Sequence, residues 1–129
     1  MSFSPDPNEV IPVTIAGGVN ALKSAYAEPS VKRFVLTSSS SAAVGTLDDG
    51  FSIGEDRYNE KAVEAAWAAV PPYAPNQGVL VYEASKTQSE QAVWKFHSEN
   101  RGRRPDLVVN TGMSQGGFRG CAVPHRLQR

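Results

Sequence analysis

The stretch VYEASKTQSEQAVWKF, residues 81–96, is the strongest helical pattern in the chain and places Tyr82 and Lys86 four residues apart. Residues at this spacing lie on the same face of an α-helix, so the two side chains can meet. An ammonium beside a phenol stabilises the phenolate, which makes the phenol a better proton donor. The spacing therefore makes Tyr82 a candidate general acid, although the same pair also occurs by chance on exposed helices.

The segments before this helix predict a helix followed by a strand. Apolar residues at spacings of three and four predict a helix over residues 9–27, with Asp6 or Asn8 as its cap. The run Phe34–Leu36 then predicts a short strand that is buried on both faces. A cluster of hydroxyls, Ser38–Ser41, follows at the end of this strand, which is where ligands bind in open parallel sheets.

With the remaining segments, the predicted order is helix, strand, short helix, long helix and strand. EKAVEAAWAAV, residues 60–70, predicts a short helix, and DLVVNTG, residues 106–112, predicts a second buried strand. Two short strands joined by a helical crossover favour a βαβ unit and a parallel sheet. Two strands alone leave unpaired edges, so we expect part of the sheet to be missing.

Composition excludes several classes of protein. The 129 residues are enough for one domain, and 13 basic residues balance 13 acidic ones, so no net charge favours nucleic acid or an anionic membrane. No apolar run approaches the roughly 20 residues that span a bilayer, and the N-terminus has no signal-peptide pattern. Cys121 stands alone, without metal-ligand spacing around it. We therefore expect a cytoplasmic protein without a metal site.

Two segments together resemble a known family. VKRFVLTSSSSAAV, residues 31–44, followed by the tyrosine stretch, is similar to the extended short-chain dehydrogenases/reductases of the NAD(P)-dependent epimerase/dehydratase superfamily. The likeness covers residues 3–110 and is strongest to fungal aldehyde/ketone reductases and to plant dihydroflavonol and cinnamoyl-CoA reductases. It implies an α/β fold of the Rossmann type, with a doubly wound parallel sheet.

The resemblance also implies an activity and a set of residues. The family reduces small-molecule carbonyl substrates, aldehydes or ketones, with NADP or NAD as cofactor. By resemblance Tyr82 is the proton donor, Lys86 supports it and hydrogen-bonds the nicotinamide ribose, and Ser39 orients the carbonyl oxygen. Ser38, Ser40 and Ser41 remain alternatives to Ser39. The helices at 9–27 and 80–98 correspond to those that form dimers in the family, so a homo- or hetero-dimer is possible; no nucleic-acid or membrane partner is implied.

The chain also departs from the family pattern. No strand, Gly-rich turn and helix precede Ser39 to seat a pyrophosphate. TGMSQGG, residues 111–117, follows the tyrosine motif instead of preceding it, and Phe118 stands where such a motif needs glycine. We therefore expect an incomplete Rossmann domain, which lacks the N-terminal nucleotide-binding strands and the C-terminal substrate lobe. Residues 1–111 would be its central part, and 112–129 a divergent, disordered tail.

On this interpretation the isolated chain is a fragment of a reductase and is inactive by itself. Two alternatives stay open, a non-catalytic interaction or dimerisation fragment and a truncated gene product. The pair Gly17–Gly18 weakens the first helix by about 1 kcal/mol per glycine, which indicates close packing against another backbone. We expect His97 and His125 on the surface, RGRR (101–104) in a solvated turn, and Trp67 and Trp94 in core or interface packing.

Overall fold

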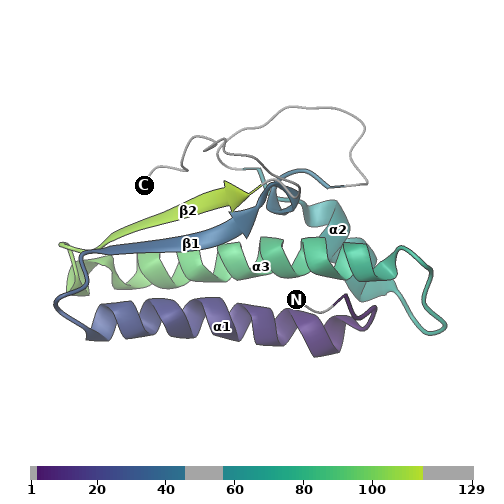
Figure 1. Ribbon diagram of the computed structural model, residues 1–129, viewed down its shortest axis with the longest axis horizontal. Coiled ribbons are helices and arrows are strands. Elements are labelled where there is room, and N and C mark those ends of the chain that lie inside the picture. Colours follow the sequence, from purple (N-terminus) through teal and green to yellow (C-terminus); the bar gives the residue numbers. More distant parts are fainter. Residues whose placement is uncertain (1–2, 46–56, 115–129) are drawn as a thin grey trace.

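The computed structural model describes residues 3–45 and 57–114. The order of helices and strands is the one that the sequence predicts (Figure 1). The elements, in order, are α1 (Pro7–Ala27), β1 (Arg33–Ser39), the 3-10 turn η1 (Ser40–Ala42), α2 (Glu60–Ala68), α3 (Gln77–Asn100), the 3-10 turn η2 (Arg101–Arg103) and β2 (Val108–Ser114).

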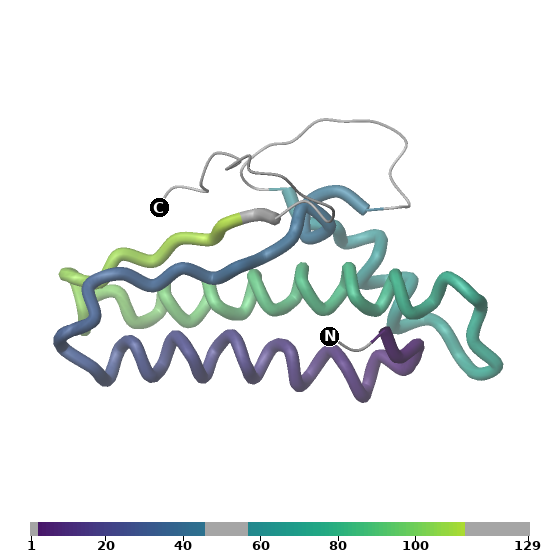
Figure 2. Tube along the Cα trace, in the orientation of Figure 1, coloured from purple at the N-terminus to yellow at the C-terminus, as the bar shows by residue number. Residues whose placement is uncertain are grey.

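The two strands form a parallel pair, which confirms the predicted βαβ unit. The register runs from Arg33 opposite Val108 to Ser39 opposite Ser114. Helices α1 and α3 run side by side beneath the sheet, and α2 packs near the start of α3 (Figures 1 and 2). The C-terminal ends of both long helices lie at one end of the molecule with the starts of both strands, and the end of β1 lies over the middle of α3, where Ser38 contacts Glu90.

Only one face of the sheet is covered by described residues. Phe34 and Leu36 pack against the core, whereas Val35 between them is 58% exposed. The prediction that β1 is buried on both faces is therefore wrong, because alternate side chains of a strand point to opposite faces and no described layer lies over the outer one. None of the described helices is long and apolar enough to cross a membrane.

Local signals explain where α1 begins and ends. The Asp6 carboxylate accepts a hydrogen bond from the backbone N–H of Asn8 at 2.9 Å, so Asp6 is the cap, and Pro7 occupies the first turn, where no N–H is needed. At the other end the Arg104 guanidinium donates to four backbone carbonyls, two in the last turn of α1 and two just after it. They belong to Ala25, Tyr26, Glu28 and Val31, at 3.2, 3.0, 3.1 and 2.7 Å.

The two glycines of α1 have different surroundings. A Cβ on Gly18 would lie 2.8 Å from Ser89 Oγ and 3.2 Å from Val93 Cγ2 of α3, whereas a Cβ on Gly17 would meet nothing within 4 Å. Close helix packing thus explains Gly18 alone. The main core lies beside this contact and is made by buried residues of α1, α3, β2 and the residue just before β2, namely Leu22, Ala25, Tyr26, Val93, Leu107 and Val109.

The prediction that His97 lies on the surface is wrong. Its side chain is 2% exposed, and its Nδ1 lies 2.8 Å from the hydroxyl of Tyr26. Trp94 is partly buried against the same core, whereas Trp67 is 42% exposed and donates its indole N–H to Gln88. The wrong prediction has a simple cause: α3 is covered by α1, α2 and the sheet, so more of its circumference is buried than an amphipathic pattern suggests.

The expected boundary at residue 112 falls inside β2, which continues to Ser114. The rest of the expected tail, residues 115–129, lies outside the described residues, and so do Cys121 and His125.

Candidate active site

Tyr82 and Lys86 lie one turn apart near the start of α3, as their spacing predicts. The Lys86 ammonium lies 5.9 Å from the centroid of the Tyr82 ring. Both side chains line a hollow of about 250 Å³ between α3 and α1, whose other wall includes Val10, Val13 and Thr14. Phe3 contacts the Tyr82 ring as well, with centroids 5.8 Å apart. The structure therefore places the phenol and the ammonium together at a surface that a small molecule can reach.

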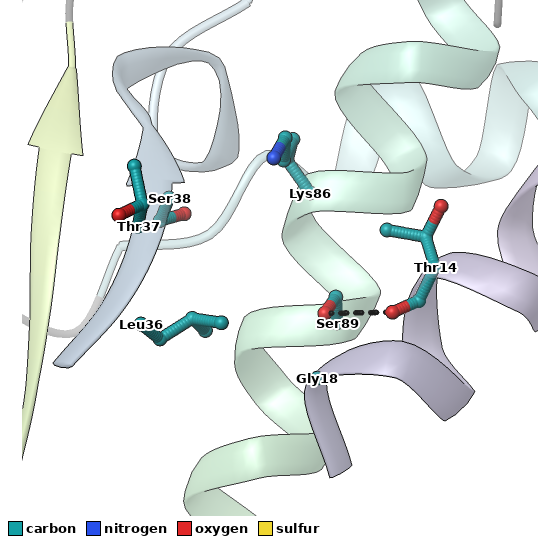
Figure 3. A pocket seen from close by; sticks show the side chains of 7 residues that line it. All are labelled: Thr14, Gly18, Leu36, Thr37, Ser38, Lys86 and Ser89. Atoms are coloured by element: carbon teal, nitrogen blue, oxygen red, sulfur yellow. Dashed lines mark hydrogen bonds between the residues drawn. The ribbon is translucent and has the colours of Figure 1, made fainter. Parts of the chain in front are cut away.

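Lys86 also faces a second hollow, which lies toward the end of β1 (Figure 3). Its volume is about 190 Å³, and four of its lining residues carry hydroxyls: Thr14, Thr37, Ser38 and Ser89. Within the described part of the chain, the Lys86 ammonium makes no hydrogen bond or ion pair. Lys86 therefore separates the tyrosine hollow from the serine hollow, and its charge is available to a ligand in either.

The serine cluster divides into side chains with different tasks. The Ser38 hydroxyl donates to the Glu90 carboxylate at 2.8 Å and lines the hollow with Lys86. The Ser39 oxygen accepts from the backbone N–H of Ser41 at 3.2 Å and so caps η1. Ser39 is 4% exposed and lines neither hollow. The structure brings Ser38 to Lys86 and does not bring Ser39 into either hollow.

Buried polar residues on α3 hold the end of β1 and the turn η1. The hydroxyl of Thr87 lies 3.4 Å from the carbonyl of Ala42. Asn59, which caps α2, donates to the carbonyl of Ser41 at 3.0 Å and to the Glu83 carboxylate at 3.3 Å, and so links the turn η1 to α3. Together with the contact of Ser38 and Glu90, these bonds fix the serine cluster against the helix that carries Tyr82 and Lys86. Sequence reasoning missed them because a glutamate on a helix is normally exposed. The available signal was that residues 83, 87 and 90 share one stripe of the helix.

The residues present fit one end of a nicotinamide nucleotide. An ammonium without a partner beside several hydroxyls suits the ribose next to the nicotinamide, whose hydroxyls both donate and accept hydrogen bonds. The pyrophosphate end does not fit the described residues, since none of their helices begins at a Gly-rich turn after a strand. Nor do the described residues include a group of three or more His, Cys, Asp or Glu side chains that could hold a metal ion.

Comparison with known proteins identifies relatives of the chain. No protein-family model matches the chain. It is 44% identical over 112 residues to the NAD-dependent epimerase/dehydratase terH of Aspergillus terreus, which covers 86% of this chain and 32% of that protein. Aldehyde reductase 2 of Sporidiobolus salmonicolor is 42% identical over 112 residues, 85% of this chain and 32% of its own length. The NAD-dependent epimerase/dehydratase tndE of Aspergillus flavipes is 40% identical over 131 residues, 99% of this chain and 34% of that protein.

A parallel βαβ unit that carries a tyrosine and a lysine four residues apart on its long helix defines, with these relatives, an α/β protein related to Rossmann-type reductases. The chain belongs to the extended short-chain dehydrogenases/reductases, in the NAD-dependent epimerase/dehydratase group. It spans about a third of the length of the relatives that it matches.

Proposed function

We propose that this chain carries the proton-transfer residues of an NAD(P)H-dependent carbonyl reductase. The observation that carries the proposal is the position of Lys86, whose ammonium lies over the Tyr82 ring on one side and faces the end of β1 on the other. One amine can thus act on both the phenol and a ligand held at the strand end. The relatives named for reductase activity support an aldehyde or ketone as the substrate.

Each residue has a distinct part in this proposal. Tyr82 donates the proton that the carbonyl oxygen acquires, and the positive charge of Lys86 stabilises the phenolate left behind. A serine hydroxyl at the end of β1 orients that oxygen; Ser39 has this role by family resemblance, and Ser38 is the alternative that the hollow favours. NADP or NAD, when bound, would supply the hydride, and Lys86 with Tyr82 would hold its ribose.

We also propose that the 129-residue chain is inactive by itself, because its described residues offer no binding site for a pyrophosphate. We further propose that the protein is cytoplasmic. Fluorescence titration of the chain with NADPH and with NADH tests this proposal. We expect no binding in the micromolar range, and clear micromolar binding would show that the chain holds its cofactor without further strands.

The proton-transfer role needs a complete cofactor site, which a hybrid enzyme can provide. In the hybrid, residues of this chain replace the matching segment of the Sporidiobolus salmonicolor aldehyde reductase. We expect the hybrid to reduce an aldehyde with NADPH or NADH, and Lys86→Met to weaken both cofactor binding and turnover. If the Lys86→Met hybrid bound the cofactor and reduced the aldehyde as well as its parent, Lys86 would have no role in the site.

A dimer through α1 and α3 is a second candidate function, because α1 has an exposed apolar residue and an open glycine one turn apart. Val13 is 69% exposed, and a Cβ on Gly17 would meet nothing within 4 Å, so another backbone could approach closely. Sedimentation of the chain with Gly17→Leu as the comparison tests this proposal. A dimer that Gly17→Leu dissociates would support it, and a monomer at all concentrations would exclude self-association.

A further inference from the structure

The end of the molecule opposite the candidate site contains a buried titratable pair that the proposed chemistry does not use. His97, near the end of α3, is 2% exposed, and its Nδ1 lies 2.8 Å from the hydroxyl of Tyr26, in the last turns of α1. The imidazole is enclosed by aromatic rings, since those of Tyr26 and Trp94 meet it edge-on at 6.2 and 5.9 Å. This pair joins two helices that are far apart in the sequence.

The hydrogen bonds at this position suit a neutral imidazole and not a cation. The Tyr26 hydroxyl can donate to Nδ1, while Nε2 is buried without a hydrogen-bond partner. After protonation both ring nitrogens are donors. Nδ1 would then need the Tyr26 oxygen as acceptor, which turns the Tyr26 proton toward the carbonyl of His97 at 3.5 Å, beyond good hydrogen-bond distance. The Nε2–H, which the neutral ring already carries when Nδ1 is the acceptor, would still lack an acceptor and would now bear part of a buried positive charge.

The surrounding charges also oppose a cation. The elements packed around the pair contribute positive groups, Lys23 of α1 and the arginines at 101, 103 and 104. Of the acidic groups at this end, Asp106 is engaged by Arg104 and Lys32, and Glu28 by Ser30. On α3 itself Lys95 and Glu99 are exposed, and the core residues 107, just before β2, and 109, within it, are apolar. Burial, and secondarily the charge of Arg101, lowers the pKa of His97 below its ordinary value of 6.5.

We propose that the Tyr26–His97 pair is an acid-sensitive latch, which holds the C-terminal ends of α1 and α3 together at neutral pH and releases them when His97 takes up a proton. The same end of the molecule contains the starts of both strands, where the backbone N–H of Val108 donates to the carbonyl of Lys32 at 2.9 Å. Opening of the latch therefore exposes the core cluster around Leu22 and Val93.

The direction of the pH effect follows from proton linkage. Below pH 6.5 His97 binds a proton in the unfolded chain but stays neutral in the folded chain, so acid favours the unfolded state. The ratio of folded to unfolded chain then falls by up to about tenfold for each pH unit, until the pH reaches the pKa of His97 in the folded chain. Above about pH 7.5 the contribution is constant, because both states are neutral.

Two measurements on the full 129-residue chain test the latch. The first is an NMR titration of the imidazole signals, in which His125, the only other histidine, is the internal comparison. We expect His97 to titrate below 6.5, and hydrogen exchange at the ends of α1 and α3 to rise as it does so. A His97 signal that titrates at or above 6.5 would overturn the proposal, even if every variant failed to fold.

The second measurement is urea unfolding between pH 7.5 and 5.5. The double variant Tyr26→Phe/His97→Phe removes the titrating group and its partner together, so we expect its stability to be flat across this range. Tyr26→Phe alone keeps the histidine and should keep the acid loss, as should His125→Gln. A double variant with the same pH profile as the parent would show that the acid sensitivity lies elsewhere and would overturn the proposal.

Discussion

The glycine pair of α1 allows a matched test of how closely α1 and α3 pack. Gly17 and Gly18 are adjacent in one helix, so alanine at either position improves the intrinsic helix propensity by the same amount, about 0.8–1 kcal/mol. At Gly17 nothing opposes this gain, because a Cβ there has no neighbour within 4 Å. We therefore expect Gly17→Ala to stabilise the protein by about 1 kcal/mol.

At Gly18 two costs oppose the gain. The new methyl group would lie 2.8 Å from Ser89 Oγ and 3.2 Å from a methyl of Val93, which is fully buried and cannot move aside. Overpacking of this kind costs about 1–3 kcal/mol, and displacement of the Ser89 hydroxyl from the carbonyl of Thr14, 3.3 Å away, costs about 0.5–1.5 kcal/mol. We expect Gly18→Ala to destabilise the protein by about 1–3 kcal/mol net.

Urea unfolding followed by circular dichroism measures both variants, and a constant slope m shows that the unfolded states are comparable. Ser89→Ala in the Gly18→Ala background removes the nearer obstacle and should recover part of the loss. If Gly18→Ala stabilised the protein as much as Gly17→Ala, the two helices could not be packed as closely as the structure shows.

Three further predictions concern the polar contacts. Arg104→Lys should lower the melting temperature, because lysine cannot donate to four carbonyls at once, whereas the matched change Arg103→Lys on the exposed turn should have little effect. The hydrogen bond from Arg104, and secondarily one from Lys32, holds the pKa of Asp106 well below its ordinary value of 3.8. The contribution of the Asp106 carboxylate to stability is therefore present above about pH 4 and is lost as the pH falls further. Asp106→Asn lacks this contribution at every pH, so in an acid titration its stability should fall less steeply than that of the parent. Glu90→Gln keeps an acceptor for the Ser38 hydroxyl, whereas Glu90→Leu removes it. Thermal unfolding should therefore show Glu90→Leu to be less stable than Glu90→Gln by about 1–3 kcal/mol, and equal stabilities would contradict the role of Glu90 as acceptor.

Local patterns were sufficient to predict the elements and their order. Helix α1 is specified by its apolar spacing and by Asp6, and α3 by a long run without proline or repeated glycine. The parallel pairing of β1 with β2 followed from the helical crossover between two short apolar runs. These features depend on residues that are near one another in the sequence, which is why a single sequence reveals them.

Burial of polar side chains could not be predicted in the same way. Glu83, Glu90 and His97 are each at most 3% exposed, although such residues are commonly exposed on helices. Their burial results from the packing of elements that are distant in the sequence. Val35 shows the opposite case, because its exposure depends on what covers the outer face of the sheet.

The candidate site was predictable in part. Tyr82 and Lys86 were found from their spacing, and the structure places them together. The choice among the serines was not decided by sequence, because strand alternation and the turn η1 set which hydroxyl faces Lys86. Family resemblance favours Ser39 and the hollow favours Ser38, so Ser38→Ala and Ser39→Ala in the hybrid enzyme would discriminate between them.

The central claim is that the Tyr82 phenol, beside the Lys86 ammonium, delivers the proton to a carbonyl oxygen. The most direct measurement is steady-state turnover of the hybrid aldehyde reductase with Tyr82→Phe, with cofactor affinity determined in parallel. Phenylalanine keeps the ring and removes only the hydroxyl, and Lys86 remains to hold the ribose, so we predict a fall in kcat of about 10²–10⁴-fold with a much smaller loss of cofactor affinity. Turnover that matches the Tyr82 parent would contradict the claim.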